Sequence, residues 1–253
     1  MPISVQEIVN RATSALDAEG SDRYRFDQDF KPAINYAIEW SVTAFNDAFA
    51  QNKLSGESLK ELNKVGIWQT NDFSRIAFDE AAVGSKLWTI IAIYPKPTVY
   101  PYRAPVVNQN KVLSTFINDL SFVKSEHAAK RLTQEEWNDN VKNVFMPGNV
   151  ILGGELTDYA YLDSVNYSST NYSNPGVFET EIRPSIANEF VAMAYLVKPN
   201  SVAQISDSVQ FPESMTNIIV EKALNFISYK QGDGTNLYGV TSADINRLVA
   251  LMR

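Results

Sequence analysis

Two segments with helical periodicity open the chain, and a polar connection separates them. Apolar residues recur at helical spacing from Val5 to Leu16 and again from Ile34 to Phe49, so each segment is expected to form an amphipathic helix with one buried face. The connection, residues 17–32, is acidic and contains Gly20, a pattern typical of a turn. This helix–connection–helix start is the most regular pattern in the sequence.

The start signals of both helices can be read from polar residues. Ser4 and Glu7 have the spacing of a capping box, in which each side chain accepts a hydrogen bond from an otherwise unpaired backbone amide. Asp27 or Asp29 is the expected N-cap of the second helix, and Pro32 is tolerated in its first turn. These signals predict a stable pair of helices.

The pattern then changes from helix to strand. Residues 54–66 are expected to form a short helix that Gly66 ends. Residues 73–78 and 86–95 are expected to be strands, and the second is apolar on both faces, which predicts a strand that is central or covered on both sides. Residues 111–145 are expected to be helical again, with a second capping box at Thr133 and Glu136.

Strands and then helices follow to the end of the chain. Strand patterns recur at residues 150–152, 158–167, 177–182 and 189–197. A helix is expected to start at Pro212 and Glu213, and a last helix to be capped by Thr241 and Asp244. We therefore predict an α+β fold with a mainly helical core and a strand-rich middle insertion. Its expected parts are an N-terminal helical part (1–67), a strand-rich middle with a helical insert (68–200), and C-terminal helices that pack back on the N-terminal part (201–253).

Composition narrows the classes of function. The chain has 253 residues, of which 45% are hydrophobic, enough for a sizeable core. A net charge of −7 disfavours a protein that grips nucleic acid by neutralising phosphates. The chain has no cysteine, which excludes disulfides and thiolate sites. The longest apolar run, Leu87 to Tyr94, is too short to span a bilayer and no signal peptide pattern is visible, so a soluble protein is expected.

The residues that carry chemistry elsewhere form no recognisable constellation here. His127 is the only histidine, and the basic residues around it predict a solvated face of a helix rather than a catalytic base. The acidic residues between Asp17 and Asp29 lack the ligand spacing of a calcium loop, and no phosphate-binding glycine motif is present. We therefore predict no catalytic residue, no metal and no cofactor, and a protein that is not an enzyme.

A stretch rich in tyrosine and acidic residues is the most suggestive surface. Residues 155–182 contain no lysine or arginine and interleave acids with Tyr159, Tyr161, Tyr167 and Tyr172. Tyrosines in a Gly/Ser/Asn-rich loop provide contact area and adaptable hydrogen bonds, which would suit a partner-binding surface. The alternative is an ordinary strand and loop with half-buried tyrosines. One candidate function is thus a soluble β-rich module that recognises glycan or protein through this loop.

The order of elements resembles a known family. The opening pattern contains Asp17, Gly20, Arg23, Tyr24 and Asp27 or Asp29, and the closing half contains Tyr195, Lys198, Pro199, Phe211 and Pro212 ahead of a long helix. This arrangement resembles the head-to-tail connector (adaptor) proteins of tailed phages, and its style is similar to ring proteins of crAss-like short-tailed phages. The resemblance covers the two ends of the chain. The middle is longer than in the smaller adaptors.

The resemblance implies a structural virion subunit. Such a subunit forms a homo-oligomeric ring, twelvefold in that family, that joins the portal protein to neighbouring connector or tail proteins. Double-stranded DNA passes non-specifically through the channel that the ring lines, and no membrane is involved. Assembly would take place in the host bacterial cytoplasm. The residues expected to contribute to the assembly interface are Asp17, Arg23, Tyr24, Asp27, Tyr159, Tyr161, Tyr167, Tyr172, Tyr195 and Phe211.

Overall fold

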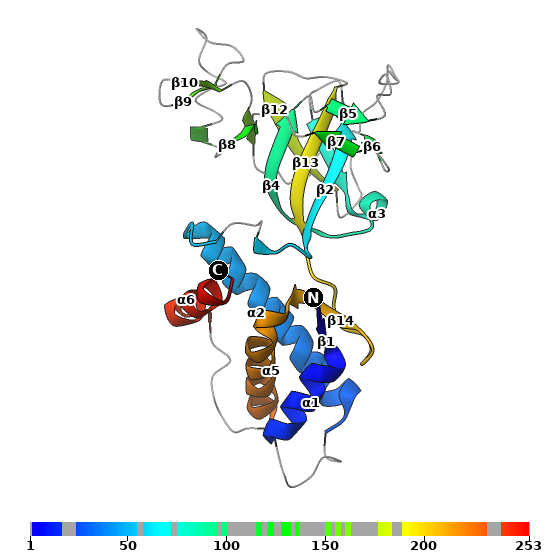
Figure 1. Ribbon diagram of the computed structural model, residues 1–253, viewed down its shortest axis with the longest axis vertical. Coiled ribbons are helices and arrows are strands. Elements are labelled where there is room, and N and C mark those ends of the chain that lie inside the picture. The colour runs from blue at the N-terminus through cyan, green and yellow to red at the C-terminus, as the bar shows by residue number, and fades with distance from the viewer. Residues whose placement is uncertain are drawn as a thin grey trace. The chain divides into compact units, whose positions relative to one another are not determined.

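The chain divides into two compact units (Figure 1). The helical unit comprises Met1–Asn63 and Lys198–Arg253, and the strand unit comprises Lys64–Val197. These boundaries lie within a few residues of the predicted divisions after residues 67 and 200. The computed structural model describes residues 2–16, 24–54, 58–71, 75–95, 98–100, 115–117, 121–123, 128–132, 135–136, 150–152, 155–157, 160–162, 177–183, 189–231 and 239–252.

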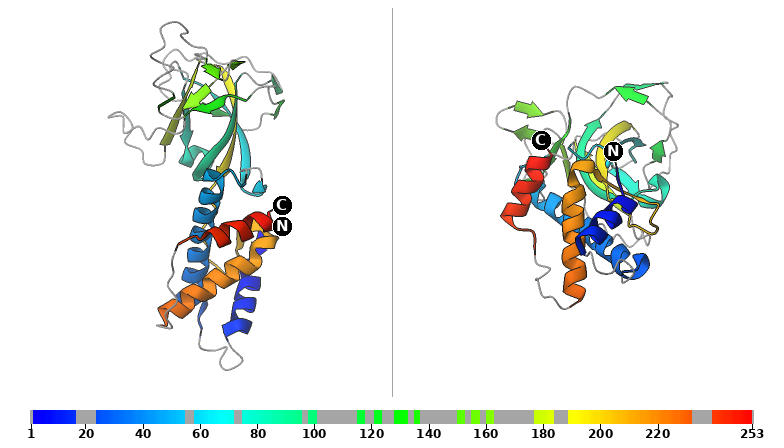
Figure 2. Two further views of the ribbon diagram at one scale, coloured as in Figure 1. Left: turned by 90° about the vertical axis from the view of Figure 1, so that its left-hand side faces the viewer. Right: turned by 60° about the horizontal axis from the view of Figure 1, so that its bottom comes forward.

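The helical unit is assembled from both ends of the sequence. Its elements are β1 (Pro2–Ser4), α1 (Val5–Leu16), the π-helix η2 (Phe26–Phe30), α2 (Lys31–Ala50), β14 (Ser208–Pro212), the 3-10 helix η4 (Glu213–Met215), α5 (Thr216–Lys230) and α6 (Ser242–Leu251). The helix α5 packs against both α1 and α2, and α6 packs against α2 (Figure 2). The long helices predicted for the two ends of the chain are therefore present.

Small residues on α2 let its neighbours approach closely. Ala33, Ala37, Ala44 and Ala48 are buried along one side of the helix, in addition to the predicted stripe that includes Ile34 and Phe45. Aromatic rings fill the spaces between helices: Tyr36 lies 5.1 Å from Phe226 of α5, and Phe45 lies 5.7 Å from Phe211 of β14, measured between ring centroids. Burying these side chains is the main source of stability for the unit.

A short antiparallel ribbon ties the first residues of the chain to its returning segment. In this ribbon Ile3 of β1 pairs with Val209 of β14, and both side chains are buried. The backbone N–H of Val5 then donates to the carbonyl of Asp207 at 3.1 Å as α1 begins. The expected capping box does not form: Ser4 ends β1, and the Glu7 carboxylate instead accepts from Arg11 at 2.6 Å.

In the described residues, the strand unit contains two four-stranded sheets. Their strand orders are β4-β13-β2-β6 and β3-β12-β11-β8, and two ribbons, β10-β9 and β5-β7, accompany them. The elements are β2 (Asn63–Gln69), β3 (Arg75–Asp79), α3 (Glu80–Val83), β4 (Leu87–Pro95), β5 (Thr98–Tyr100), β6 (Thr115–Ile117), β7 (Ser121–Val123), β8 (Lys130–Leu132), β9 (Val150–Leu152), β10 (Glu155–Thr157), β11 (Ala160–Leu162), β12 (Val177–Arg183) and β13 (Phe190–Val197).

Aromatic residues from both sheets form the centre of the strand unit. Every residue of β13 is buried. The ring of Tyr195 on this strand meets Trp68 of β2 at 5.7 Å and Phe78 of β3 at 5.0 Å, both edge-on, while Trp68 and Phe78 lie 5.8 Å apart. Edge-to-face contacts of this kind add to the stabilisation from burial. The two sheets therefore share one core.

The prediction of a mixed α+β fold is confirmed, but two local predictions are wrong where residues are described. Helix was expected over residues 111–145, yet β6, β7 and β8 lie between residues 115 and 132, because Thr115–Ile117 pairs with distant β2. Residues 135–136 are helical, and 137–145 lie outside the described residues. In place of the helix expected over 54–66, residues 60–62 form a turn and β2 starts at Asn63, so Gly66 lies inside a strand. The strand β4 lies at the edge of its sheet and β13 is central, but β4 has no exposed residue, in keeping with the other alternative, coverage on both sides. Pairing between distant segments outweighs local propensity at such sites.

Candidate functional site

Half of the residues predicted for the assembly interface lie outside the described residues. They are Asp17, Arg23, Tyr159, Tyr167 and Tyr172. His127 and Thr133 lie outside them as well. Binding of glycan or protein through the tyrosine loop therefore stays a prediction, because it depends mainly on these tyrosines.

Three other predicted interface residues are in the core rather than on the surface. Tyr161, Tyr195 and Phe211 are all buried within the subunit. Phe211 stacks on Phe45, and burial raises the pKa of the Tyr195 hydroxyl above its usual value of 10.0. These three side chains cannot contact a partner in this conformation, and the prediction of an interface role for them is wrong. Tyr161 and Tyr195 lie in continuously apolar strands, and Phe211 lies in a strand that alternates exposed and buried residues, and these patterns were the sequence signals for a core role.

Tyr24 and Asp27 lie where the end of the connection meets the end of α5. The hydroxyl of Tyr24 accepts a hydrogen bond from Nε2 of Gln231 at 3.0 Å, and Nζ of Lys230 donates to the carbonyl of Gln28 at 2.8 Å. Asp27 is exposed and pairs with Lys31 at 3.8 Å. The structure therefore brings together two of the predicted residues in an accessible position.

Neither expected N-cap is used at this junction. The N-cap residue of η2 is Arg25, without a side-chain cap, and η2 continues directly into α2 with Pro32 in the first turn. Asp29 lies within the helix and reaches back, so that its carboxylate accepts from the N–H of Arg25 at 2.9 Å. An acidic side chain in the first turn also suits the positive end of the helix dipole.

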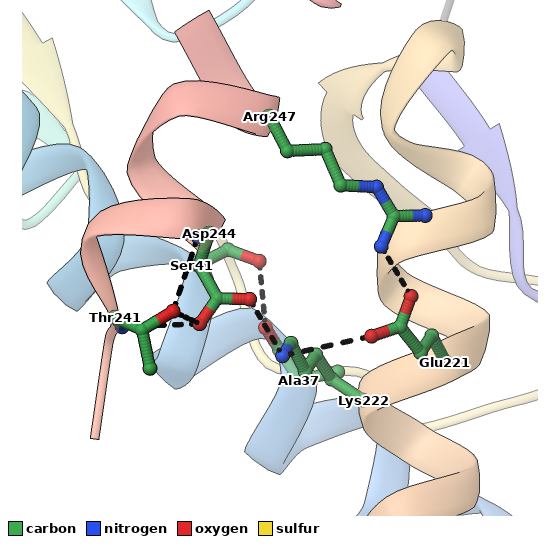
Figure 3. A network of polar contacts seen from close by, with 7 residues as sticks. All are labelled: Ala37, Ser41, Glu221, Lys222, Thr241, Asp244 and Arg247. Carbon is green, nitrogen blue, oxygen red and sulfur yellow. Dashed lines mark hydrogen bonds and ion pairs between the residues drawn. The ribbon is translucent and has the colours of Figure 1, made fainter.

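The cap predicted for the last helix, α6, forms as expected. The Thr241 side chain accepts from the N–H of Asp244, and the Asp244 carboxylate accepts from the N–H of Thr241 at 3.0 Å. The same carboxylate accepts from Nζ of Lys222 on α5, also at 3.0 Å (Figure 3). The Asp244 carboxylate therefore both caps α6 and attaches it to α5.

Lys222 is the centre of this polar network. Its ammonium lies 4.1 Å from the ring centroid of Trp40 on α2 and 3.7 Å from the carboxylate of Glu221. Glu221 in turn accepts from Arg247 of α6 at 2.5 Å (Figure 3). The Lys222 side chain is only 14% exposed and that of Asp244 19%. We call Trp40, Ala48, Glu221 and Lys222 the α6 dock.

The environment of Asp244 favours its charged form. Burial by itself would raise the pKa of this carboxyl, but hydrogen bonds from Thr241 and Lys222, together with the lysine charge, lower the pKa below its usual value of 3.8. Lys222 is a charge within the apolar stripe of α5, beside buried Ile218 and Ile219. A charged residue within such a stripe is the sequence signal for this network.

The returning segment before β14 forms a well-ordered loop, which we call the return loop (residues 198–207). The side chain of Asn35 brackets Val202: its Oδ1 accepts from the Val202 N–H at 2.7 Å and its Nδ2 donates to the Val202 carbonyl at 3.1 Å. The Asp207 carboxylate accepts from the N–H groups of Gln204 and Ala203, both at 2.8 Å, and these bonds lower its pKa. The loop therefore has a fixed conformation.

Exposed apolar side chains in the helical unit lie on ordered backbone. Tyr229 at the end of α5 is 52% exposed and Ile205 in the return loop is 38% exposed, and Leu251 at the end of α6 is also exposed. The return loop leads through β14 and η4 into the start of α5, whereas Tyr229 lies at the end of α5. Single exposed apolar residues are common, but fixed ones can serve as anchors in an interface.

Comparison with known proteins gives no family. No model of a protein family matches the sequence, and a search of curated proteins finds no match. Within the described residues, no group of three or more His, Cys, Asp or Glu side chains is placed to hold a metal ion. Nor does any helix in that part of the chain have the length and apolar character needed to cross a membrane.

Proposed function

We propose that the chain is a structural subunit, not an enzyme, of a ring in the head-to-tail connector of a tailed phage. Its helical unit would be the adaptor core, and the strand unit would be an insertion into it. The observation that supports this proposal is a helical unit built from both ends of the chain, with fixed apolar side chains at two different places. The ring would contact the portal protein on one side and connector or tail proteins on the other.

A closed ring of identical subunits requires two different, complementary faces on each subunit. The end of α5, with Tyr229, Tyr24 and Asp27, provides one candidate face, and the return loop with Ile205 provides another. Aromatic residues are favoured anchors in interfaces because they bury much area at low cost in side-chain entropy. Each anchor would sit in a pocket of a neighbouring subunit or ring.

The charge of the chain suits the proposed position in the virion. A net charge of −7 disfavours tight binding to phosphates, so double-stranded DNA would pass the ring without being retained. The ring would assemble in the host cytoplasm and remain in the particle, at the connector or tail.

Mass photometry of the purified chain tests the proposal. We expect a single large species whose mass is a whole multiple of 28.3 kDa. Replacing Tyr229→Glu should weaken assembly, because a charge would enter an apolar contact. The matched control is Ser214→Glu, which adds the same charge at an exposed polar residue. A wild-type chain that stays monomeric, alone and with its portal, would overturn the proposal; equal assembly of all three proteins would exclude the Tyr229 face.

A further inference from the structure

The return loop is exposed over most of its length and carries no charge between its two end residues. Residues 199–206 contain no Asp, Glu, Lys or Arg, and all of them except Pro199 and Val202 are exposed. Ile205 is the large apolar side chain among the exposed ones. Charged residues are depleted at the centres of protein interfaces, because burying an unpaired charge is costly. The composition of the loop therefore suits the centre of an interface.

Asp207, at the end of the loop, is turned back onto the backbone of the loop. Its carboxylate accepts from the N–H groups of Ala203 and Gln204, and its own N–H donates to the carbonyl of Gln204 at 3.1 Å. The carbonyl of Asp207 accepts from the N–H of Val5, which joins this turn to the start of α1. Residues 203–207 therefore form a closed turn that contains the exposed Ile205.

Asn35 of α2 fixes the first half of the loop from outside it. The two hydrogen bonds of its side chain go to the N–H and the carbonyl of Val202, whose own side chain is buried. Nearby, Oε1 of Gln210 accepts from the N–H of Asn200 at 3.0 Å. A side chain that satisfies both backbone polar groups of one residue holds that residue in one conformation. The conformation of the loop is therefore set in part by a residue of α2.

We propose that Asn35 and Asp207 are positioning residues that hold the return loop in the conformation in which it binds the next copy in the ring. A loop that is already ordered loses less conformational entropy on binding. The bound surface belongs to a second copy because a closed ring needs contacts between unlike faces. In the described part of the helical unit the exposed large apolar side chains, Ile205, Tyr229 and Leu251, lie on three different elements. This inference rests on the proposed ring function and names the residues that set the strength of one of its contacts.

The variants Asn35→Ala and Asp207→Ala test the proposal, because each removes bonds to the loop and changes none of its exposed side chains. Alanine has a higher helix propensity than asparagine, so α2 should keep its form. A typical hydrogen bond contributes about two- to twelvefold to an equilibrium constant, and the apparent affinity scales with the fraction of chains in the binding conformation. We expect the concentration at which half of the chains are assembled, measured by mass photometry, to rise about tenfold. Amide exchange within residues 198–207 of the dilute protein should become faster in the same variants.

Three further variants control this experiment. Asp207→Asn keeps a carbonyl oxygen that accepts from the loop amides, so it should assemble nearly as well as the wild type. Thr241→Ala removes the cap of α6, at a comparable loss of stability, and touches neither the loop nor Asn35; it should leave the half-assembly concentration unchanged. Ile205→Ser should weaken assembly without speeding amide exchange in the loop, because it removes the apolar contact and none of the bonds that order the loop.

The outcomes separate the positioning role from the ring itself. Weaker assembly with faster loop exchange in both alanine variants, and wild-type assembly of Thr241→Ala, support the proposal. Faster loop exchange with unchanged assembly overturns it and leaves the proposed function standing, since the ring then forms without an ordered return loop. Unchanged loop exchange, or an equal loss of assembly in Thr241→Ala, overturns it as well. If the wild type never assembles, alone or with its portal, the proposed function and this inference both fail.

Discussion

Replacing Lys222→Met removes one charge from the polar network and keeps the length of the side chain. Methionine and lysine have similar helix propensities, so α5 itself should be unaffected. The methionine can still lie against Trp40, while Asp244 loses its ammonium partner at 3.0 Å and stays largely buried. The variant therefore isolates the electrostatic part of the attachment of α6.

The expected loss can be estimated from the contacts. A hydrogen bond to a charged group contributes about 1.5–3 kcal/mol, and a cation–π contact about 0.5–1 kcal/mol where water still has access. The pair with Glu221 adds little, because its carboxylate is substantially exposed. Since these terms are coupled, we expect the free energy of unfolding of the helical unit to fall by about 2–3 kcal/mol.

Urea unfolding followed by far-UV circular dichroism measures this loss, because the helical unit supplies the long helices. A double-mutant cycle with Asp244→Asn isolates the Lys222–Asp244 term, since asparagine keeps a carbonyl oxygen that accepts from Thr241. We expect a coupling free energy of at least about 1 kcal/mol, in line with a partly buried charged hydrogen bond. A coupling below about 0.5 kcal/mol, the value of ordinary exposed pairs, would refute the reasoning.

Three further predictions concern the core, the cap and the response to acid. Phe211→Ala should destabilise the helical unit by about 3–5 kcal/mol in the same urea assay, because it leaves a cavity beside Phe45; a loss below about 1 kcal/mol would contradict a core role for Phe211. Thr241→Ala should cost about 1 kcal/mol, while Thr241→Ser restores the cap; amide exchange confined to α6 would report it. The lowered pKa values of Asp244 and Asp207 provide stability that is complete above pH 3.8 and is lost as the pH falls through the lower folded-state values. Urea titrations across that range should show a flatter acid limb for Asp244→Asn, and an unchanged limb would exclude Asp244 as its source.

Elements whose signals are local could be predicted from the sequence. The stripes of α1, α2 and α5 and the apolar runs of β4 and β13 repeat over many residues, so periodicity alone identifies them. The cap of α6 was also predicted, because Thr241 and Asp244 are close in sequence. The strands near residues 115–132 were missed because partners far away in the sequence create them.

The contacts of the candidate site were likewise hard to predict from the sequence, because they join segments that are far apart along the chain. Lys222 contacts Trp40, and Asn35 brackets Val202, across large separations that no local pattern encodes. Phe211 was assigned to an interface because it matched a family pattern, although its strand alternates exposed and buried residues. Tyr24 did prove to be accessible at a junction between segments, where the end of the connection meets α5.

Negative-stain electron microscopy of the purified chain tests the central claim most directly. Large particles isolated by size exclusion should appear as closed rings with one rotational symmetry, and their mass should equal that number of 28.3 kDa subunits. The proposed structural role requires this closure, because heterologous contacts that do not close produce filaments instead. A chain that gives only monomers, or open filaments, at the highest concentration at which it stays in solution and also in the presence of its portal would contradict the account.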